Sequence, residues 1–130
     1  MNTDPDLAQR VVIQQSTLPW AAAPGAGVRY RWLEGGAAAA ARATAIVQLA
    51  PGAKVAHCAD RLGEEIVVLD GVLSDAFGSY HKGTYIKNPP GSSHACESAS
   101  GCILFVKRHH LDAEDDRRIV VDSATMPWYQ

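Results

Sequence analysis

Two segments with regular glycine spacing constrain the fold of this chain more than any other feature. The first follows the pattern Gly52-x5-Cys58-x-Asp60-x3-Glu64-x6-Gly71, and the second follows Gly83-x5-Pro89-x-Gly91-x2-His94-x3-Ser98. Side chains alternate between the two faces of a β-strand, so Cys58 and Asp60 are expected to share one face while His57 points to the other.

Short strands separated by turn residues are predicted along most of the chain. Residues 28–32 alternate apolar and charged side chains, the period of a half-buried strand. Residues 44–49, 65–69 and 103–107 are apolar and rich in β-branched side chains, and Asp70-Gly71 is a hairpin signal. No segment shows sustained helical periodicity. This pattern indicates an all-β sandwich or barrel.

Composition excludes several functional classes. The chain has 130 residues and a formal charge of −2, with no basic patch that would indicate nucleic-acid binding. Its longest apolar run is far too short to span a membrane, and the polar N-terminus does not resemble a signal peptide. Three cysteines fit reduced thiols better than a disulfide framework, so a cytoplasmic location is expected.

Taken together, the two segments resemble the cupin superfamily, whose fold is a small jelly-roll barrel. The resemblance implies a single all-β cupin domain over 1–130, with a core at about 20–108, an N-terminal arm at 1–19 and a C-terminal tail at 109–130. Within the superfamily, the chain is most similar to the cupin domain of ChrR-type zinc anti-sigma factors and their free-standing relatives. The residues that carry this similarity are Ala50-Pro51-Gly52, 63–71, Leu73-Ser74-Asp75, Gly83-Thr84-Tyr85, 88–94 and Gly101-Cys102.

The resemblance also implies a metal site inside the barrel. Its expected ligands are Cys58, Asp60, Glu64 and His94, although cupins usually have histidine at the first two positions. A thiolate, an imidazole and two carboxylates buried together are costly without a cation. Cysteine and histidine favour zinc, and a thiolate beside an oxygen-activating iron would be exposed to oxidation, so zinc is preferred and iron is second.

Alternatives at this site remain open. A β-bulge would let His57 replace Cys58 as a ligand, and Cys96, two residues after His94, is a possible additional ligand or a redox partner of Cys58. A further alternative is a lost metal site, with its carboxylates protonated or paired with a basic side chain. Tyr85 and Phe105 are candidates to line a ligand cavity, since small barrels can hold one small ligand.

The expected function is a metal-binding cupin enzyme acting on a small carbonyl compound, either dioxygenase-like or a lyase or isomerase. The alternative is a regulatory cupin that senses a small molecule or an oxidant without catalysis. Expected partners are a small-molecule ligand or substrate and a second copy of the chain in a homodimer. The anti-sigma factors hold the sigma factor with a separate N-terminal domain for which this chain has no room, so sigma-factor binding is not expected.

Overall fold

The computed structural model describes residues 10–22, 27–36, 42–55, 63–91, 95–108 and 119–125 of the chain. These residues form antiparallel strands and one short 3-10 helix, η1 (Gln15–Thr17). None of the helices in these ranges is long and apolar enough to cross a membrane. The all-β architecture expected from the sequence is therefore confirmed.

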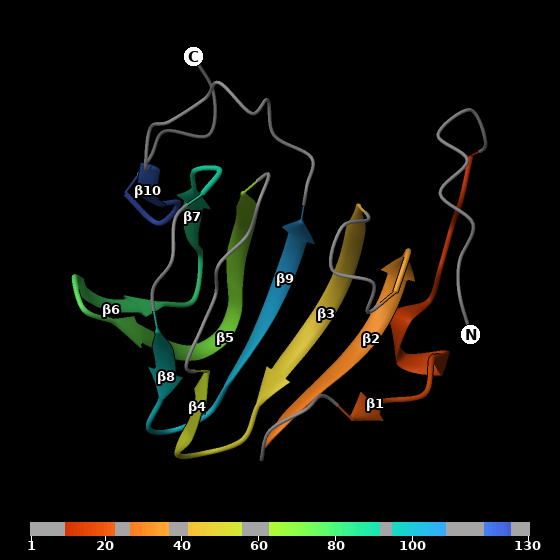
Figure 1. The fold of residues 1–130 in the computed structure, drawn as a ribbon, viewed down its shortest axis with the longest axis horizontal. Coiled ribbons are helices and arrows are strands. Elements are labelled where there is room, and N and C mark those ends of the chain that lie inside the picture. The colour runs from red at the N-terminus through yellow and green to blue at the C-terminus, as the bar shows by residue number, and fades with distance from the viewer. Residues whose placement is uncertain are drawn as a thin grey trace.

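A large curved sheet forms one wall of the molecule, with the order β1-β2-β3-β9-β5-β7-β10 (Figure 1). A smaller group of strands packs beside it, in which β8 pairs with β4 and β5, and β6 pairs with β5. The strands are β1 (Ala21–Ala22), β2 (Val28–Glu34), β3 (Ala43–Leu49), β4 (Ala53–Val55), β5 (Glu64–Asp75), β6 (Gly78–His81), β7 (Thr84–Asn88), β8 (Cys96–Ser98), β9 (Cys102–Arg108) and β10 (Ile119–Asp122).

Strand β5 joins the two groups because it belongs to both. Its first half pairs with β7 and β9 in the large sheet, and its second half pairs with β6 and β8. The change occurs at Gly71, which has a φ of 77° and follows a register shift between Val68 and Asp70. The hairpin expected at Asp70-Gly71 is therefore wrong: the glycine bends β5, and the chain reverses only at Ala76-Phe77.

The core lies between the large sheet and the smaller group. Its fully buried side chains come from one face of each strand, as strand alternation requires. They are Val28, Ala45, Val47, Leu49, Ala53, Ile66, Val68, Leu73, Ile86, Cys102 and Leu104.

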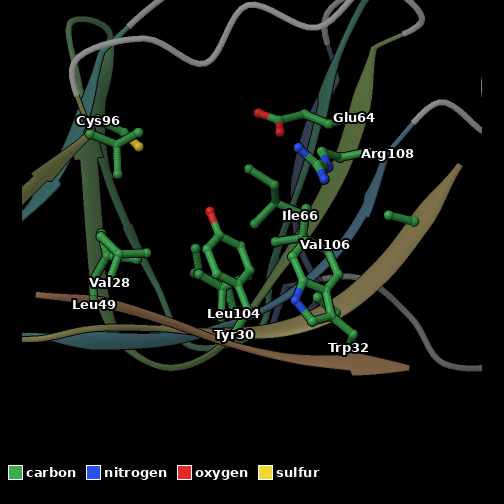
Figure 2. Close-up of a pocket in the computed structure, with 14 residues that line it drawn as sticks. Val28, Tyr30, Trp32, Leu49, Glu64, Ile66, Cys96, Leu104, Val106 and Arg108 are labelled. Atoms are coloured by element: carbon green, nitrogen blue, oxygen red, sulfur yellow. The ribbon is translucent and has the colours of Figure 1, made fainter. Parts of the chain in front are cut away.

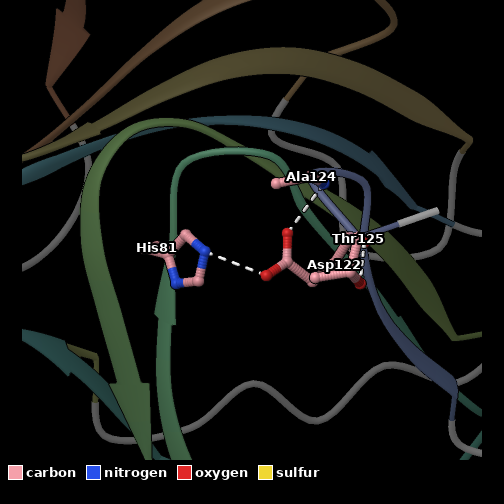
Figure 3. Close-up of polar contacts among 4 residues, drawn as sticks. All are labelled: His81, Asp122, Ala124 and Thr125. Atoms are coloured by element: carbon pink, nitrogen blue, oxygen red, sulfur yellow. Dashed lines mark hydrogen bonds and ion pairs between the residues drawn. The ribbon is translucent and has the colours of Figure 1, made fainter.

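Side-chain contacts hold both ends of the described chain in place. Near the N-terminus, the guanidinium groups of Arg29 and Arg31 lie over the Trp20 ring, 4.9 and 4.0 Å from its centroid. At the other end, Nε2 of His81 lies 3.0 Å from Oδ2 of Asp122, while Oδ1 of Asp122 accepts the backbone N–H of Ala124 (Figure 3). The Asp122 carboxylate thus ties β10 to the end of β6 and also closes its own turn.

The bend in β5 gives a first testable prediction. A Cβ atom at Gly71 would overlap the carbonyl oxygen of Gly101, whereas one at Gly52, with a similar φ of 83°, meets no atom within 4 Å. A left-handed residue other than glycine costs about 1–2 kcal/mol by itself. We expect Gly52→Ala to lose about that much stability and Gly71→Ala to lose on the order of 3–4 kcal/mol. Urea unfolding measures both, and equal losses would contradict the close approach.

A second prediction concerns the attachment of β10. His81→Ala removes only an exposed ion pair, which contributes at most about 1 kcal/mol. Asp122→Ala removes that pair and the hydrogen bond from Ala124 as well, so we expect a loss of about 1–2 kcal/mol. Urea unfolding compares the two variants, and amide exchange along β10 should accelerate more in Asp122→Ala. If His81→Ala costs as much as Asp122→Ala, the turn contact contributes nothing.

Candidate functional site: a cavity with an acidic and a basic group

A cavity of about 140 Å³ lies inside the barrel, between the large sheet and the smaller group of strands. A cavity on the order of 150 Å³ is large enough to hold a benzene-sized molecule. Most of the lining is apolar and comes from β2, β3, β5 and β9, and the remainder comes from Val55 of β4 and Cys96 of β8. The dimensions therefore suit a small ligand with an apolar body.

Polar groups reach this cavity from two sides (Figure 2). Glu64 and Arg108 project from one wall toward the open space, and Cys96 lies on the opposite side. Glu64 and Arg108 are directly opposite each other in the pairing of β5 with β9, so the register itself brings an acid and a base to the same end of the cavity. Tyr30 and Trp32 form the nearby aromatic surface.

Glu64 is only 7% exposed and is held by its neighbour on β7. Nδ2 of Asn88 donates a hydrogen bond of 3.0 Å to Oε1 of Glu64, and the two residues are directly opposite in the β5–β7 pairing. Asn88 is 2% exposed, and its Oδ1 has no hydrogen-bond partner within the described chain. A buried amide oxygen without a partner is costly, so this is a point within the described interior where a further hydrogen-bond donor would be favourable.

Arg108 is positioned by contacts that leave most of its donors available. Its guanidinium carbon lies 5.5 Å from the centroid of the Trp32 ring, and Nη2 donates to the carbonyl oxygen of Gly36 at 3.4 Å. Trp32 in turn stacks on Tyr30, with centroids 4.8 Å apart and planes 5° from parallel. Within the described ranges, Arg108 forms no ion pair with a carboxylate.

The two cysteines that the structure describes lie in different surroundings. Cys96 is half-buried in the cavity wall, whereas Cys102 is fully buried in the core. Burial raises the pKa of the Cys102 thiol, so this group stays protonated at neutral pH and acts as an apolar core residue.

The predicted metal ligands are only partly within the described chain. Glu64 and Cys96 both line the cavity. Cys58, Asp60, His94 and the alternative ligand His57 lie outside the described residues. Among the residues that the structure describes, no group of three or more histidine, cysteine, aspartate or glutamate side chains is close enough together to hold a metal ion.

Tyr85 and Phe105 were expected from the sequence to line a ligand cavity, but neither residue lines this one. Both are opposite Val67 in the sheet register, while the neighbouring inward positions are Ile66, Leu104 and Val106. Alternation therefore turns both aromatic rings to the other face of the large sheet, where the Tyr85 hydroxyl donates to Glu65.

Sequence reasoning missed four residues at this site: Tyr30, Trp32, Asn88 and Arg108. A signal for the last two was present, since Asn88 follows Ile86 by two positions and Arg108 follows Val106 by two. Each polar residue thus continues the inward face of an apolar strand. Its polarity alone suggested solvent exposure.

Comparison with known proteins identifies the family. The sequence profile described as the ChrR Cupin-like domain matches residues 8–112. The chain belongs to this family. No curated protein matches the sequence.

Solved structures of cupins share the fold at low sequence identity. The anti-sigma factor ChrR of Rhodobacter sphaeroides, solved in complex with SigE, is 20% identical with a TM-score of 0.61, covering 71% of this chain and 50% of that one. An acetylacetone dioxygenase from Acinetobacter johnsonii is 14% identical with a TM-score of 0.63, covering 95% and 91%. An RmlC-like cupin from Ralstonia eutropha is 15% identical with a TM-score of 0.67, covering 90% and 82%.

The similarity to ChrR corrects one expectation. Sigma-factor binding was not expected because the chain has no room for a separate helical domain. The ChrR-type chain that shares this fold is seen in complex with SigE, and the present chain spans half of its length. The exclusion of a sigma-factor partner therefore does not hold.

The contact between Asn88 and Glu64 gives a third prediction. In protein treated with a chelator, we expect Asn88→Leu to lose about 1–3 kcal/mol of stability, because the Glu64 carboxylate stays buried without its amide donor. The double variant Asn88→Leu/Glu64→Met replaces both partners with apolar groups and should recover most of that loss. Urea unfolding of the four proteins measures the coupling. Additive losses in the double variant would show that the two side chains act independently.

Proposed function

We propose that this chain is a metal-binding cupin that acts on a small carbonyl compound inside the barrel. The proposed ligands are Glu64 together with Cys58, Asp60 and His94, and Cys96 or His57 remain possible additions. The observation that carries the proposal is the buried Glu64 carboxylate, which lines a mostly apolar cavity of small-molecule size. Cupins generally bind divalent metals, and membership of the family gives the proposal its context.

The described residues fit a cation at this point. A nearly buried carboxylate needs an opposite charge or several hydrogen bonds to offset its desolvation. Asn88 supplies one donor to Glu64, and the oxygen of the same amide, unpartnered among the described residues, is a group that a metal-bound water would satisfy. Zinc is preferred over iron because the proposed set contains a thiolate.

In such a reaction, the residues of the chain would orient the bound molecule and exclude water from it. A divalent metal, when bound, would polarise the carbonyl oxygen of the substrate. Asn88 would hold Glu64 in one orientation, and the apolar wall would keep bulk water away from the substrate. Arg108 would face the polar end of the bound molecule.

A second candidate function is a regulatory domain that binds a small molecule without converting it. The similarity to ChrR, which is solved with SigE, favours this alternative, and Cys96 in the cavity wall offers a thiol beside the ligand. Both candidates use the same cavity. They differ in whether the bound molecule is converted.

Elemental mass spectrometry tests the metal site. We expect about one zinc per chain in untagged protein purified without nickel resin or chelator, and a clear loss of metal in both Glu64→Gln and His94→Ala. The matched control is the double variant His109→Ala/His110→Ala, which removes a histidine pair that can bind metal adventitiously and should leave the content unchanged.

Low metal content that is the same in all variants would reject the proposed metal site.

A product assay with small diketones separates the two candidate functions, the enzyme and the regulatory domain. Turnover that is lost in His94→Ala supports an enzyme, whereas ligand binding without turnover supports the regulatory domain.

A further inference from the structure

The proposed function places Arg108 at the polar end of the bound molecule but does not name the chemical group that Arg108 contacts. Among the described lining residues, Arg108 is the only basic side chain and Glu64 is the only acidic one. The guanidinium group reaches the open space at the same end as Glu64, next to the aromatic surface of Trp32 (Figure 2). A half-buried cation in the wall of a ligand-sized cavity indicates which polar group the ligand carries.

The contacts of Arg108 leave its planar edge available to a ligand. Stacking on Trp32 occupies the face of the guanidinium group, and only Nη2 has a hydrogen bond within the described chain, at 3.4 Å to Gly36. Arginine has five N–H donors arranged in a fork that matches the two oxygens of a carboxylate. Bidentate pairs of this kind are among the strongest hydrogen-bonded contacts in proteins.

The adjoining surface selects the shape of the rest of the ligand. Tyr30 and Trp32 are stacked 4.8 Å apart and nearly parallel, so each ring covers one face of the other, and their remaining surfaces form an aromatic wall of the cavity beside the guanidinium group. A planar ring packs against such a wall through offset-stacked or edge-to-face contacts. The volume of about 140 Å³ suits a ligand with one ring.

The charge balance limits the ligand to a single negative charge. Glu64 is opposite Arg108 in the β5–β9 register, so a dianion such as a phosphate ester would meet a carboxylate at the same end of the cavity. A monocarboxylate can direct its two oxygens to Arg108 and place its apolar body over Tyr30 and Trp32.

We propose that the cavity binds a planar monocarboxylate of about the size of benzoate, with its carboxylate on Arg108 and its ring on the Tyr30–Trp32 wall. This inference deepens the proposed function, since it adds that the small carbonyl compound carries one carboxylate group, which contacts Arg108. The carboxylate contact uses side chains of this chain alone. Binding can therefore be tested without any metal.

Isothermal titration calorimetry on chelator-treated protein provides the test. The probes are benzoate and its neutral analogue benzamide. We expect benzoate to bind about tenfold or more tightly than benzamide, because one charge-assisted bidentate contact contributes at least that factor. In Arg108→Met the preference should disappear. Arg108→Lys should retain part of it, because the charge remains while the fork is lost.

Lys107→Met is the matched control. Lys107 is adjacent on β9 but is not among the cavity-lining residues, so its removal should leave the preference for benzoate intact. Urea unfolding checks that each variant is folded. If Arg108→Met unfolds, Arg108→Lys and Lys107→Met still decide the question, since the first must weaken benzoate binding relative to the second.

Three results would overturn the inference: no binding of benzoate at millimolar concentration, equal affinity for benzamide, or benzoate binding that Arg108→Met and Arg108→Lys leave unchanged. Its failure can be distinguished from that of the proposed function. A stoichiometric metal without preference for benzoate rejects only the carboxylate site, and a preference for benzoate in a chain that holds no metal rejects only the metal site.

Discussion

The close approach of two glycines, Gly71 and Gly101, is the constraint on which the rest of the barrel depends. At Gly71 the backbone of β5 passes so near the carbonyl oxygen of Gly101 that no side chain fits between them. This contact lets one strand leave the large sheet and continue in the smaller group without interruption. Without the bend, β4, β6 and β8 would not close over the core. The cavity between the two groups of strands would then not form.

The same strand also sets the chemistry of the cavity. Because β5 starts at Glu64, its first side chain lies inward at the end of the barrel, between Asn88 on β7 and Arg108 on β9. These three polar residues come from adjacent strands in register: Asn88 and Arg108 follow an apolar inward face, and Glu64 precedes one. An apolar cavity that ends in a few convergent polar groups is the usual form of a small-molecule site.

Sequence patterns predicted the strands because alternation and spacing are local properties, whereas the inward position of Glu64 was expected from the resemblance to cupins. They failed at Gly71, since an Asp-Gly pair is compatible with both a hairpin and a bulge. The bulge found here depends on the close approach of Gly101, which is distant in the sequence. They also failed for Tyr85 and Phe105, which were expected to line the ligand cavity. The face that each ring occupies depends on the pairing of its strand with Val67, and the register between two strands far apart in sequence cannot be predicted from either strand alone.

Arg108 shows why a polar residue on an inward face is informative. Arg108 is half-buried and forms no ion pair within the described ranges, so the hydration that its charge loses is not offset by a carboxylate. A methionine or leucine at this position would pack into the core at lower desolvation cost. The aromatic stack at Trp32 orients Arg108 without neutralising its charge, and Asn88 does the same for Glu64. An arrangement that orients Arg108 beside an apolar cavity and leaves most of its donors available is best explained by binding, because stability alone would favour an apolar side chain at that position.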